Sequence, residues 1–182
     1  AQEAIPSAER PLTMAQPLAR LALTLQLQEI RGLPPEQVRA HPAAAEFPGA
    51  VPEGAPRVTR TLQVDTGVPG WHSTGLYAAP GEAIRLSIPA EAAGRGLIVR
   101  IGAHTDGLWG SDAWRRCPEI TCTRPLTSER VAAANAFGGL VYVEVPSRCG
   151  LGTVPVEIAG AVEAPHFVLG RTDPVQWREE IR

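Results

Sequence analysis

Apolar and polar residues alternate along most of the chain after Pro56. Short runs of this kind are separated by turn residues such as Gly, Pro and Asp. Their apolar members are Val58, Leu62 and Val64; Ile84, Leu86 and Ile88; Leu97, Val99 and Ile101; Val141, Val143 and Val145; and Val154, Val156 and Ile158. A period of two is typical of a strand with one buried face. Six or seven such strands, with "EAPHFVLG" as a weaker last one, predict a mostly β fold, an antiparallel β-sandwich of jelly-roll or immunoglobulin-like type.

The N-terminal part has a different period. Leu residues fall at positions 18, 21 and 25 and at 23 and 27, between Pro17 and a Gly32 suited to end a helix. We therefore predict a short helix over 17–31, followed by a Pro-rich and Ala-rich connection. The chain divides into a helical segment with linker (1–55), a sandwich (56–172) and a connection (173–182). Pro155 inside one run predicts an edge strand.

Composition excludes two classes of partner. The chain has 182 residues and a net charge of -2, and its 17 basic residues are all Arg and are scattered. Without a basic cluster, we expect no nucleic-acid binding. The most apolar run, "PLARLALTLQLQEI", is interrupted by polar residues and falls short of the roughly 20 residues that span a membrane.

Aromatic and Arg side chains in predicted turns and loops are the candidate binding residues. They occur in "GWHSTGLY" and in the loop "TDGLWGSDAWRRCPEI". Exposed aromatic rings beside Arg are common in binding surfaces, and aromatic faces suit sugar rings. The candidate glycan or partner surface comprises Trp71, Tyr77, Trp109, Trp114, Arg115 and Arg116. The alternative is that the Trp rings fold back onto the sandwich or onto another part of the protein.

Two catalytic interpretations of the polar residues are weaker. Ser73 follows His72 directly, so in an extended chain their side chains point to opposite faces, and no third group is identifiable to orient the imidazole. His104 and Asp106 could share an ion, but two ligands are too few for a metal site. We expect neither a catalytic residue nor a metal ligand set in this chain.

Four stretches resemble a known family. "WHSTGLYAAPGE", "IVRIGAHTDGL", "NAFGGLVYVEVP" and "VEIAGAVEAPHFVLGRTDPVQW" come in the order and spacing of the enhancin-like, mucin-targeting zinc metallopeptidases, peptidase family M sixty. The resemblance covers about residues 45 to 180. It implies that this chain corresponds to the β-rich part of these enzymes, which precedes their catalytic part. The family signature H-E-x-x-H is absent, because none of the four His residues is followed by Glu.

The resemblance implies a function for a larger protein. The chain is then a non-catalytic N-terminal sandwich of a secreted or periplasmic bacterial metallopeptidase that acts on O-glycoproteins such as mucins. Its partners would be the catalytic part of the same protein, which would hold the zinc, and glycans or glycoproteins. The chain itself is expected to fold but to be inactive alone. The alternative is an independent carbohydrate-binding or adhesion module.

The three cysteines lack the spacing of a zinc site. The extracellular setting implied by the resemblance favours one disulfide among Cys117, Cys122 and Cys149, with one thiol left over. The sequence does not decide the pair. The alternative is three buried, reduced thiols, which would suit a cytosolic protein and count against secretion.

Overall fold

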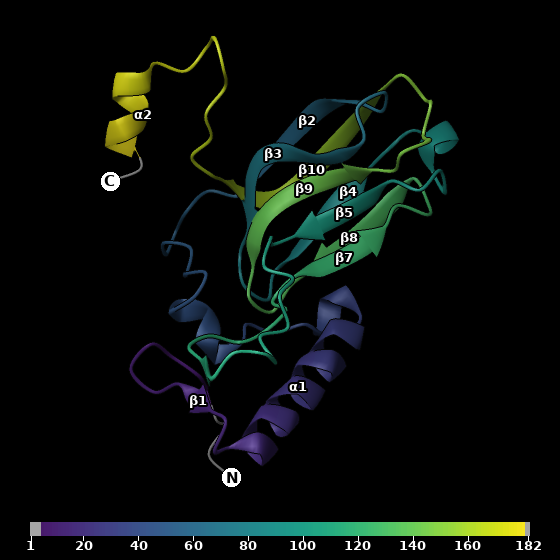
Figure 1. The fold of residues 1–182 in the computed structure, drawn as a ribbon. Coiled ribbons are helices and arrows are strands. Elements are labelled where there is room, and N and C mark those ends of the chain that lie inside the picture. The colour runs from purple at the N-terminus through teal and green to yellow at the C-terminus, as the bar shows by residue number, and fades with distance from the viewer. Residues whose placement is uncertain (1–4, 181–182) are drawn as a thin grey trace.

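The protein is built mainly from strands, as shown in Figure 1 by a computed structural model that describes residues 5–180. The strands are β1 (Leu12–Thr13), β2 (Val58–Asp65), β3 (Gly70–Ala78), β4 (Ala83–Ser87), β5 (Ile98–Ile101), β6 (Ala113–Trp114), β7 (Cys122–Pro125), β8 (Arg130–Ala134), β9 (Gly139–Val145) and β10 (Thr153–Glu163). The helices are α1 (Pro17–Gly32) and α2 (Pro174–Glu180), with 3₁₀ turns η1 (Pro35–Gln37), η2 (Pro42–Ala45) and η3 (Ala90–Ala92). The predicted mostly β fold with an N-terminal helix is confirmed.

Eight of the strands form two antiparallel layers joined by one strand. The first layer has the order β2-β10-β4-β8, and the second has the order β7-β5-β9-β3. The last residues of β10 leave the first layer and pair with β3 of the second. The two layers face each other as a sandwich, because each can bury its apolar face only against the other.

Strand β10 turns the corner between the layers at Gly160. The register on β2 shifts between Ala159 and Ala161, and Gly160 has a φ of 91°, which favours glycine. The sequence predicted an edge position for this strand because of Pro155, and that prediction is wrong. Strand β10 lies between β2 and β4, but β4 pairs only with Glu157–Ala159. Pro155 therefore lies where β10 has a neighbour on one side only, and a missing N–H is tolerated there.

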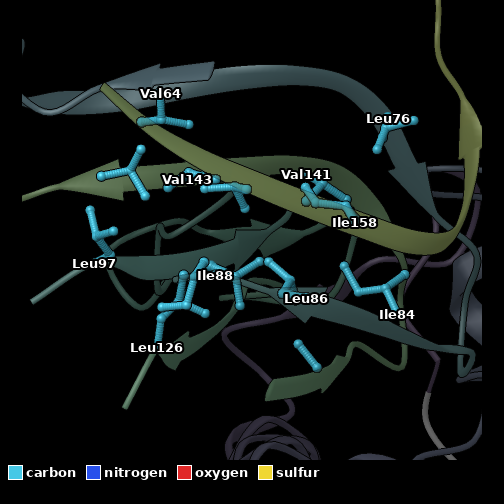
Figure 2. Packing of buried hydrophobic residues seen from close by; sticks show 14 of the residues in the cluster. Val64, Leu76, Ile84, Leu86, Ile88, Leu97, Leu126, Val141, Val143 and Ile158 are labelled. Atoms are coloured by element: carbon cyan, nitrogen blue, oxygen red, sulfur yellow. The ribbon is translucent and has the colours of Figure 1, made fainter. Parts of the chain in front are cut away.

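The main core fills the space between the two layers (Figure 2). Alternate residues of each strand point into it, as the period of two requires. Its fully buried members include Leu76, Ile84, Leu86, Leu97, Val99, Ile101, Leu126, Val141, Val143, Val156 and Ile158. Cys149 also belongs to this core.

A second core lies at one end of the sandwich, where α1 packs beneath it (Figure 1). Helix α1 contributes Leu23 and Leu27, and the loop between β5 and β7 contributes Trp114 and Ile120. Strands β1 and β6 pair and connect the N-terminal segment to this loop. The first 55 residues are thus more than a helix and a linker, because they share a hydrophobic core with the loop.

The residues at the end of β10 and just after it contact β2 and β3. The Ala164 N–H donates to the Gly75 carbonyl at 3.0 Å, and Glu163 forms an ion pair with Arg60. Of the weak last strand "EAPHFVLG", only Glu163 lies in a strand, so that part of the prediction is wrong. Pro165 lacks an N–H for continued pairing.

Helix α2 occupies most of the predicted connection 173–182, of which residues 181 and 182 lie outside the described part. No helix within residues 5–180 is long and apolar enough to cross a membrane.

Candidate binding surface

The two Trp residues of the β5–β7 loop differ in exposure. Trp114 is completely buried, its indole N–H donates to the Leu108 carbonyl at 2.6 Å, and the Arg20 guanidinium lies 4.8 Å from its ring centre. The rings of Trp109 and Trp114 pack nearly perpendicular to each other, with their centres 4.9 Å apart, and Trp109 is 51% exposed. Trp114 therefore anchors the second core and is not available to a ligand, whereas Trp109 remains on the surface.

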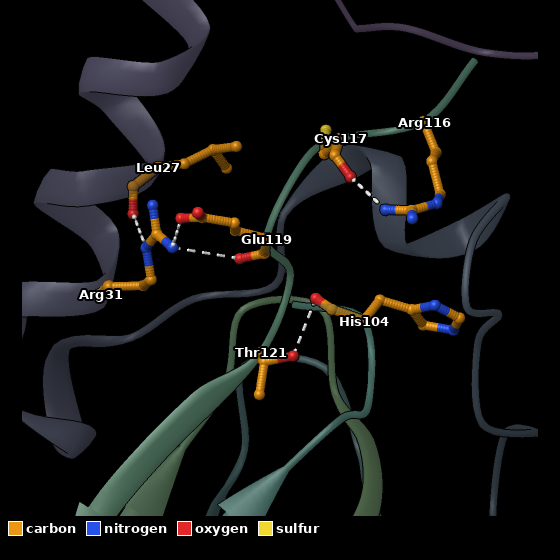
Figure 3. Close-up of polar contacts among 7 residues, drawn as sticks. All are labelled: Leu27, Arg31, His104, Arg116, Cys117, Glu119 and Thr121. Atoms are coloured by element: carbon orange, nitrogen blue, oxygen red, sulfur yellow. Dashed lines mark hydrogen bonds and ion pairs between the residues drawn. The ribbon is translucent and has the colours of Figure 1, made fainter. Parts of the chain in front are cut away.

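The two neighbouring Arg residues also differ. Arg116 donates to the Cys117 carbonyl at 2.9 Å (Figure 3). It also forms an ion pair with Asp106, and its guanidinium lies 5.4 Å from the ring centre of Phe47. Arg115 is exposed, and no hydrogen bond or ion pair is recorded for it within the described residues. The contacts of Arg116 with Asp106 and Cys117 lie within the β5–β7 loop, and its contact with Phe47 connects this loop to the N-terminal segment.

The three cysteines are free thiols in place of the expected disulfide. Cys117 belongs to the second core and Cys149 to the main core, while Cys122 is buried on β7. Cys117 and Cys149 pack in their cores as small apolar side chains do, whereas Cys122 lines a polar pocket. Burial raises the pKa of Cys117 to about 12, with a smaller opposing effect of Arg116. Burial also raises the pKa of Cys122.

Tyr77 lies apart from Trp71, although both are on β3. Its hydroxyl donates to the Gly49 carbonyl at 3.1 Å, and burial raises its pKa. It lines an apolar groove of about 340 Å³ between residues 48–56 and 162–165. The register on β9 shifts between Ser73 and Tyr77, so the bulge separates the two aromatic residues.

Trp71 is the centre of an aromatic and charged cluster on the outer face of the second layer. The Arg100 guanidinium of β5 lies 4.2 Å from its ring centre, and Tyr142 of β9 lies 5.5 Å away at a tilt of 49°. Arg100 also forms an ion pair with Glu144 of β9, and both side chains are largely buried. Trp71 is nevertheless 48% exposed, so part of its ring faces solvent.

A polar pocket of about 350 Å³ adjoins this cluster through Arg100. Its lining residues come from α1, the β5–β7 loop and the adjoining strands: Arg31, Arg100, Thr105, Glu119, Thr121, Cys122 and Thr123. Arg31 donates to the Glu119 carboxylate at 2.6 Å, and Thr121 donates to the His104 carbonyl at 2.9 Å (Figure 3). The pocket thus combines two Arg residues, a carboxylate and three hydroxyls.

Glu119 is held in an unusual backbone conformation at this pocket. Its φ of 46° lies in the left-handed region, which is uncommon for a non-glycine residue. Its N–H donates to the Asp106 carbonyl at 3.0 Å, and Arg31 contacts both its carbonyl and its carboxylate. These contacts fix the direction of the carboxylate.

The weaker catalytic and metal candidates lie in separate places. His72 has Nε2 2.7 Å from the Val68 carbonyl, and Ser73 is exposed. His104 packs against the Phe47 ring, whereas Asp106 pairs with an Arg. In the part of the chain that the structure describes, no three His, Cys, Asp or Glu side chains are placed to hold a metal ion.

Sequence reasoning missed the partners of Trp71. The alternation over 97–101 and 141–145 puts Arg100, Tyr142 and Glu144 on outward faces, and this signal was present in the sequence. Their meeting with Trp71 depends on the strand order β5-β9-β3, which the alternation does not give.

Comparison with known proteins identifies the family. The family model for the N-terminal domain of M60-like peptidases matches residues 53–159, more than half of the chain. TRPM8 channel-associated factor 2 of Homo sapiens is 41% identical over 114 residues, and the TRPM8 channel-associated factor homolog of Danio rerio is 38% identical over 112 residues. Each alignment covers 62% of this chain and 12% of the relative, so the chain spans only a small part of their length.

A solved structure shares the fold. The IMPa metallopeptidase from Pseudomonas aeruginosa superposes with a TM-score of 0.51 at 22% identity, over 78% of this chain and 16% of IMPa. This likeness concerns the fold, whereas the family model identifies the family. The chain belongs to the family of N-terminal domains of M60-like peptidases.

Proposed function

We propose that this chain is the non-catalytic N-terminal sandwich of a secreted bacterial enhancin-like zinc metallopeptidase that acts on O-glycosylated proteins such as mucins. The observation that carries the proposal is the family match over residues 53–159. IMPa supports it, because that bacterial metallopeptidase shares the fold and has a structure in complex with an O-glycopeptide. In this proposal the sandwich contacts the catalytic part of the protein and takes no part in peptide hydrolysis.

Zinc and the catalytic groups belong to another part of the longer protein in this proposal. The curated relatives are much longer than the segment they share with this chain, and the alignment with IMPa likewise covers 16% of that protein. An H-E-x-x-H helix would supply two zinc ligands and a general base there. The vertebrate relatives are named for association with the TRPM8 channel, and a protein-contacting role for the shared segment agrees with our assignment.

Helix α1 offers a surface for contact with the catalytic part. Leu23 and Leu27 are buried, but Leu18, Leu21 and Leu25 are exposed along the opposite face, and Leu18 is 80% exposed. Spacings of three and four residues align these side chains in one stripe. Burying a Leu side chain fully is worth about 1.5–3 kcal/mol, so an apolar stripe left in water favours a covering partner. We assign the catalytic part of the same protein as that partner.

The experiment replaces Leu18, Leu21 and Leu25 by Gln in the full-length protein. Because the three side chains face solvent in this domain, the domain should stay folded while its contact with the catalytic part weakens. We expect faster limited proteolysis in the segment 164–173 and slower cleavage of an O-glycosylated protein. The control is Val68→Gln in the turn between β2 and β3, where the side chain is 54% exposed but lies outside the stripe. Unchanged proteolysis and cleavage in the triple variant would refute the packing role.

An independent carbohydrate-binding or adhesion module is the second candidate. The half-exposed Trp71 beside a hydroxyl-lined pocket favours it. The gene distinguishes the two candidates, because the first requires a reading frame that continues into an H-E-x-x-H sequence. A reading frame without that sequence would contradict the first and leave the second.

A further inference from the structure

We infer that Trp71, Arg100 and the adjoining pocket form a binding site for a neutral saccharide. The inference deepens the second candidate function, a carbohydrate-binding module, and does not depend on the proposed link to a metallopeptidase. A sugar ring has an apolar face of C–H groups and an edge of hydroxyls. A site for it therefore needs an exposed aromatic face next to donors and acceptors that are already in place.

Trp71 supplies the aromatic face. The Arg100 guanidinium lies 4.2 Å from the ring centre on one side, and the ring remains 48% exposed. Arg100 is fixed by its ion pair with Glu144, so the Trp71 indole packs against a side chain that is already held in place. A supported ring loses less conformational freedom when a ligand binds than a free surface side chain does.

The pocket supplies the hydrogen-bonding groups. Arg100 lines it together with the hydroxyls of Thr105, Thr121 and Thr123. Arg100 contacts Glu144 through Nε, and within residues 5–180 its two Nη groups make no hydrogen bond, so their N–H donors are not used by the protein. The volume of about 350 Å³ lies within the range of about 300–1,000 Å³ that is usual for small-ligand sites.

The charges of the site favour a neutral ligand over an anion. Arg100 is paired with Glu144, and Arg31 is paired with Glu119. Both Arg residues that line the pocket are thus paired with carboxylates, so an acidic sugar would meet the Glu119 carboxylate with no unpaired lining Arg to offset the repulsion. The fixed carboxylate of Glu119 is instead suited to accept hydrogen bonds from sugar hydroxyls.

The test uses the tryptophan indole signals in ¹H–¹⁵N spectra of the purified chain. The chain has four Trp residues, so few signals must be assigned. The probes are methyl β-galactoside, methyl N-acetyl-β-glucosaminide and lactose, with sialyllactose as the charged counterpart. We expect saturable millimolar binding of at least one neutral probe, with a shift of the Trp71 indole and none of Trp109. Trp109 is a matched internal control, because it is 51% exposed and does not line the pocket.

Variants separate stacking from structural effects. Trp71→Ala should weaken binding roughly tenfold or more, Trp71→Phe should weaken it less because a ring remains, and Trp109→Ala should leave it unchanged. Dispersed spectra of all three variants would show that they are folded. The inference is overturned if no neutral probe shifts the Trp71 indole, if Trp71 and Trp109 shift alike, or if sialyllactose alone binds.

Discussion

The side chain of Asn135 connects the two hydrophobic cores, and its removal should destabilise the protein strongly. Asn135 is buried, and its Nδ2 donates to the carbonyls of Ile101 at 3.1 Å, Ile120 at 2.8 Å and Gly138 at 2.9 Å. Its Oδ1 accepts from the Phe137 N–H at 3.2 Å. One amide thus joins the end of β5, the loop that carries the second core and the β8–β9 turn.

Asn135→Ala removes all of these hydrogen bonds without adding a replacement. A buried polar group left without a partner costs about 1–3 kcal/mol. The Phe137 N–H and at least one of the three carbonyls lose their partner, so we expect a loss of about 2–6 kcal/mol in the free energy of unfolding. Typical domains have about 5–15 kcal/mol in total, so the variant should be close to unfolding.

Asn135→Asp tests the direction of these bonds. The aspartate keeps the shape and can still accept from Phe137, but its ionised second oxygen faces carbonyl oxygens and donates nothing. At neutral pH it should therefore be at least as unstable as the Ala variant. Burial and the facing carbonyls raise the pKa of such a carboxyl above its value in the unfolded chain. Stability should thus recover as the pH falls and the carboxyl becomes a donor.

Urea unfolding followed by circular dichroism measures both variants. The matched control is Gln63→Ala on β2, which removes an exposed amide and should change stability by less than about 0.5 kcal/mol. A loss below about 1 kcal/mol for Asn135→Ala would show that the amide does not join the two cores as the structure indicates. An Asp variant as stable as wild type at neutral pH would refute the assigned directions of its hydrogen bonds.

Three further predictions concern buried or crowded positions. Cys117 should react slowly with a thiol reagent in the native protein and quickly once the protein is unfolded. Because the pKa of Cys117 is raised from 9.0 to about 12 in the folded protein, only the unfolded thiol ionises just above pH 9, and the free energy of unfolding should fall as the pH rises there. Cys117→Ala should make this fall with pH less steep. Gly139→Ala should cost at least about 2 kcal/mol in urea unfolding, because its φ is 138° and a Cβ would lie 2.7 Å from backbone, whereas Gly150→Ala, with open space around it, should cost about 1 kcal/mol. Arg20→Met should speed amide hydrogen exchange in β1 and β6 more than in β9, because Arg20 contacts Trp114 and donates to two backbone carbonyls of this region.

The strands could be predicted from the sequence because their signal is local. Val141, Val143 and Val145 are buried, while Tyr142 and Glu144 between them face outward, as a period of two requires. The residues of one strand alone determine which of its faces is apolar. The order of the strands in each layer depends on which strands pair, and the pattern within a single strand carries no information about its neighbours.

The helix shows where the pattern was ambiguous. Leu18, Leu21 and Leu25 form one apolar stripe and Leu23 and Leu27 another, and the sequence did not show which is buried. The buried stripe also carries Arg20, which sequence reasoning would place in solvent. Arg20 is tolerated there because backbone carbonyls accept its hydrogen bonds.

The candidate surface was predicted only in part. Trp71 and Trp114 were both named as candidate surface residues, with the alternative that the loop Trp rings fold back onto the sandwich. Trp71 is 48% exposed, whereas Trp114 follows the alternative and is completely buried. It is buried because the N-terminal segment covers it, and this contact joins residues about 90 positions apart, as the 92-residue separation of Arg20 and Asp112 shows. Long-range contacts of this kind have no local signal.

The central proposal is that this member of the family of N-terminal domains of M60-like peptidases folds on its own and has no catalytic activity by itself. Its most direct test combines elemental analysis for zinc with incubation of the purified chain and an O-glycosylated protein. Peptide hydrolysis by the metal route needs an activated water on zinc with about three protein ligands. We predict a folded chain without stoichiometric zinc and without cleavage. Stoichiometric zinc together with chelator-sensitive cleavage would contradict the account.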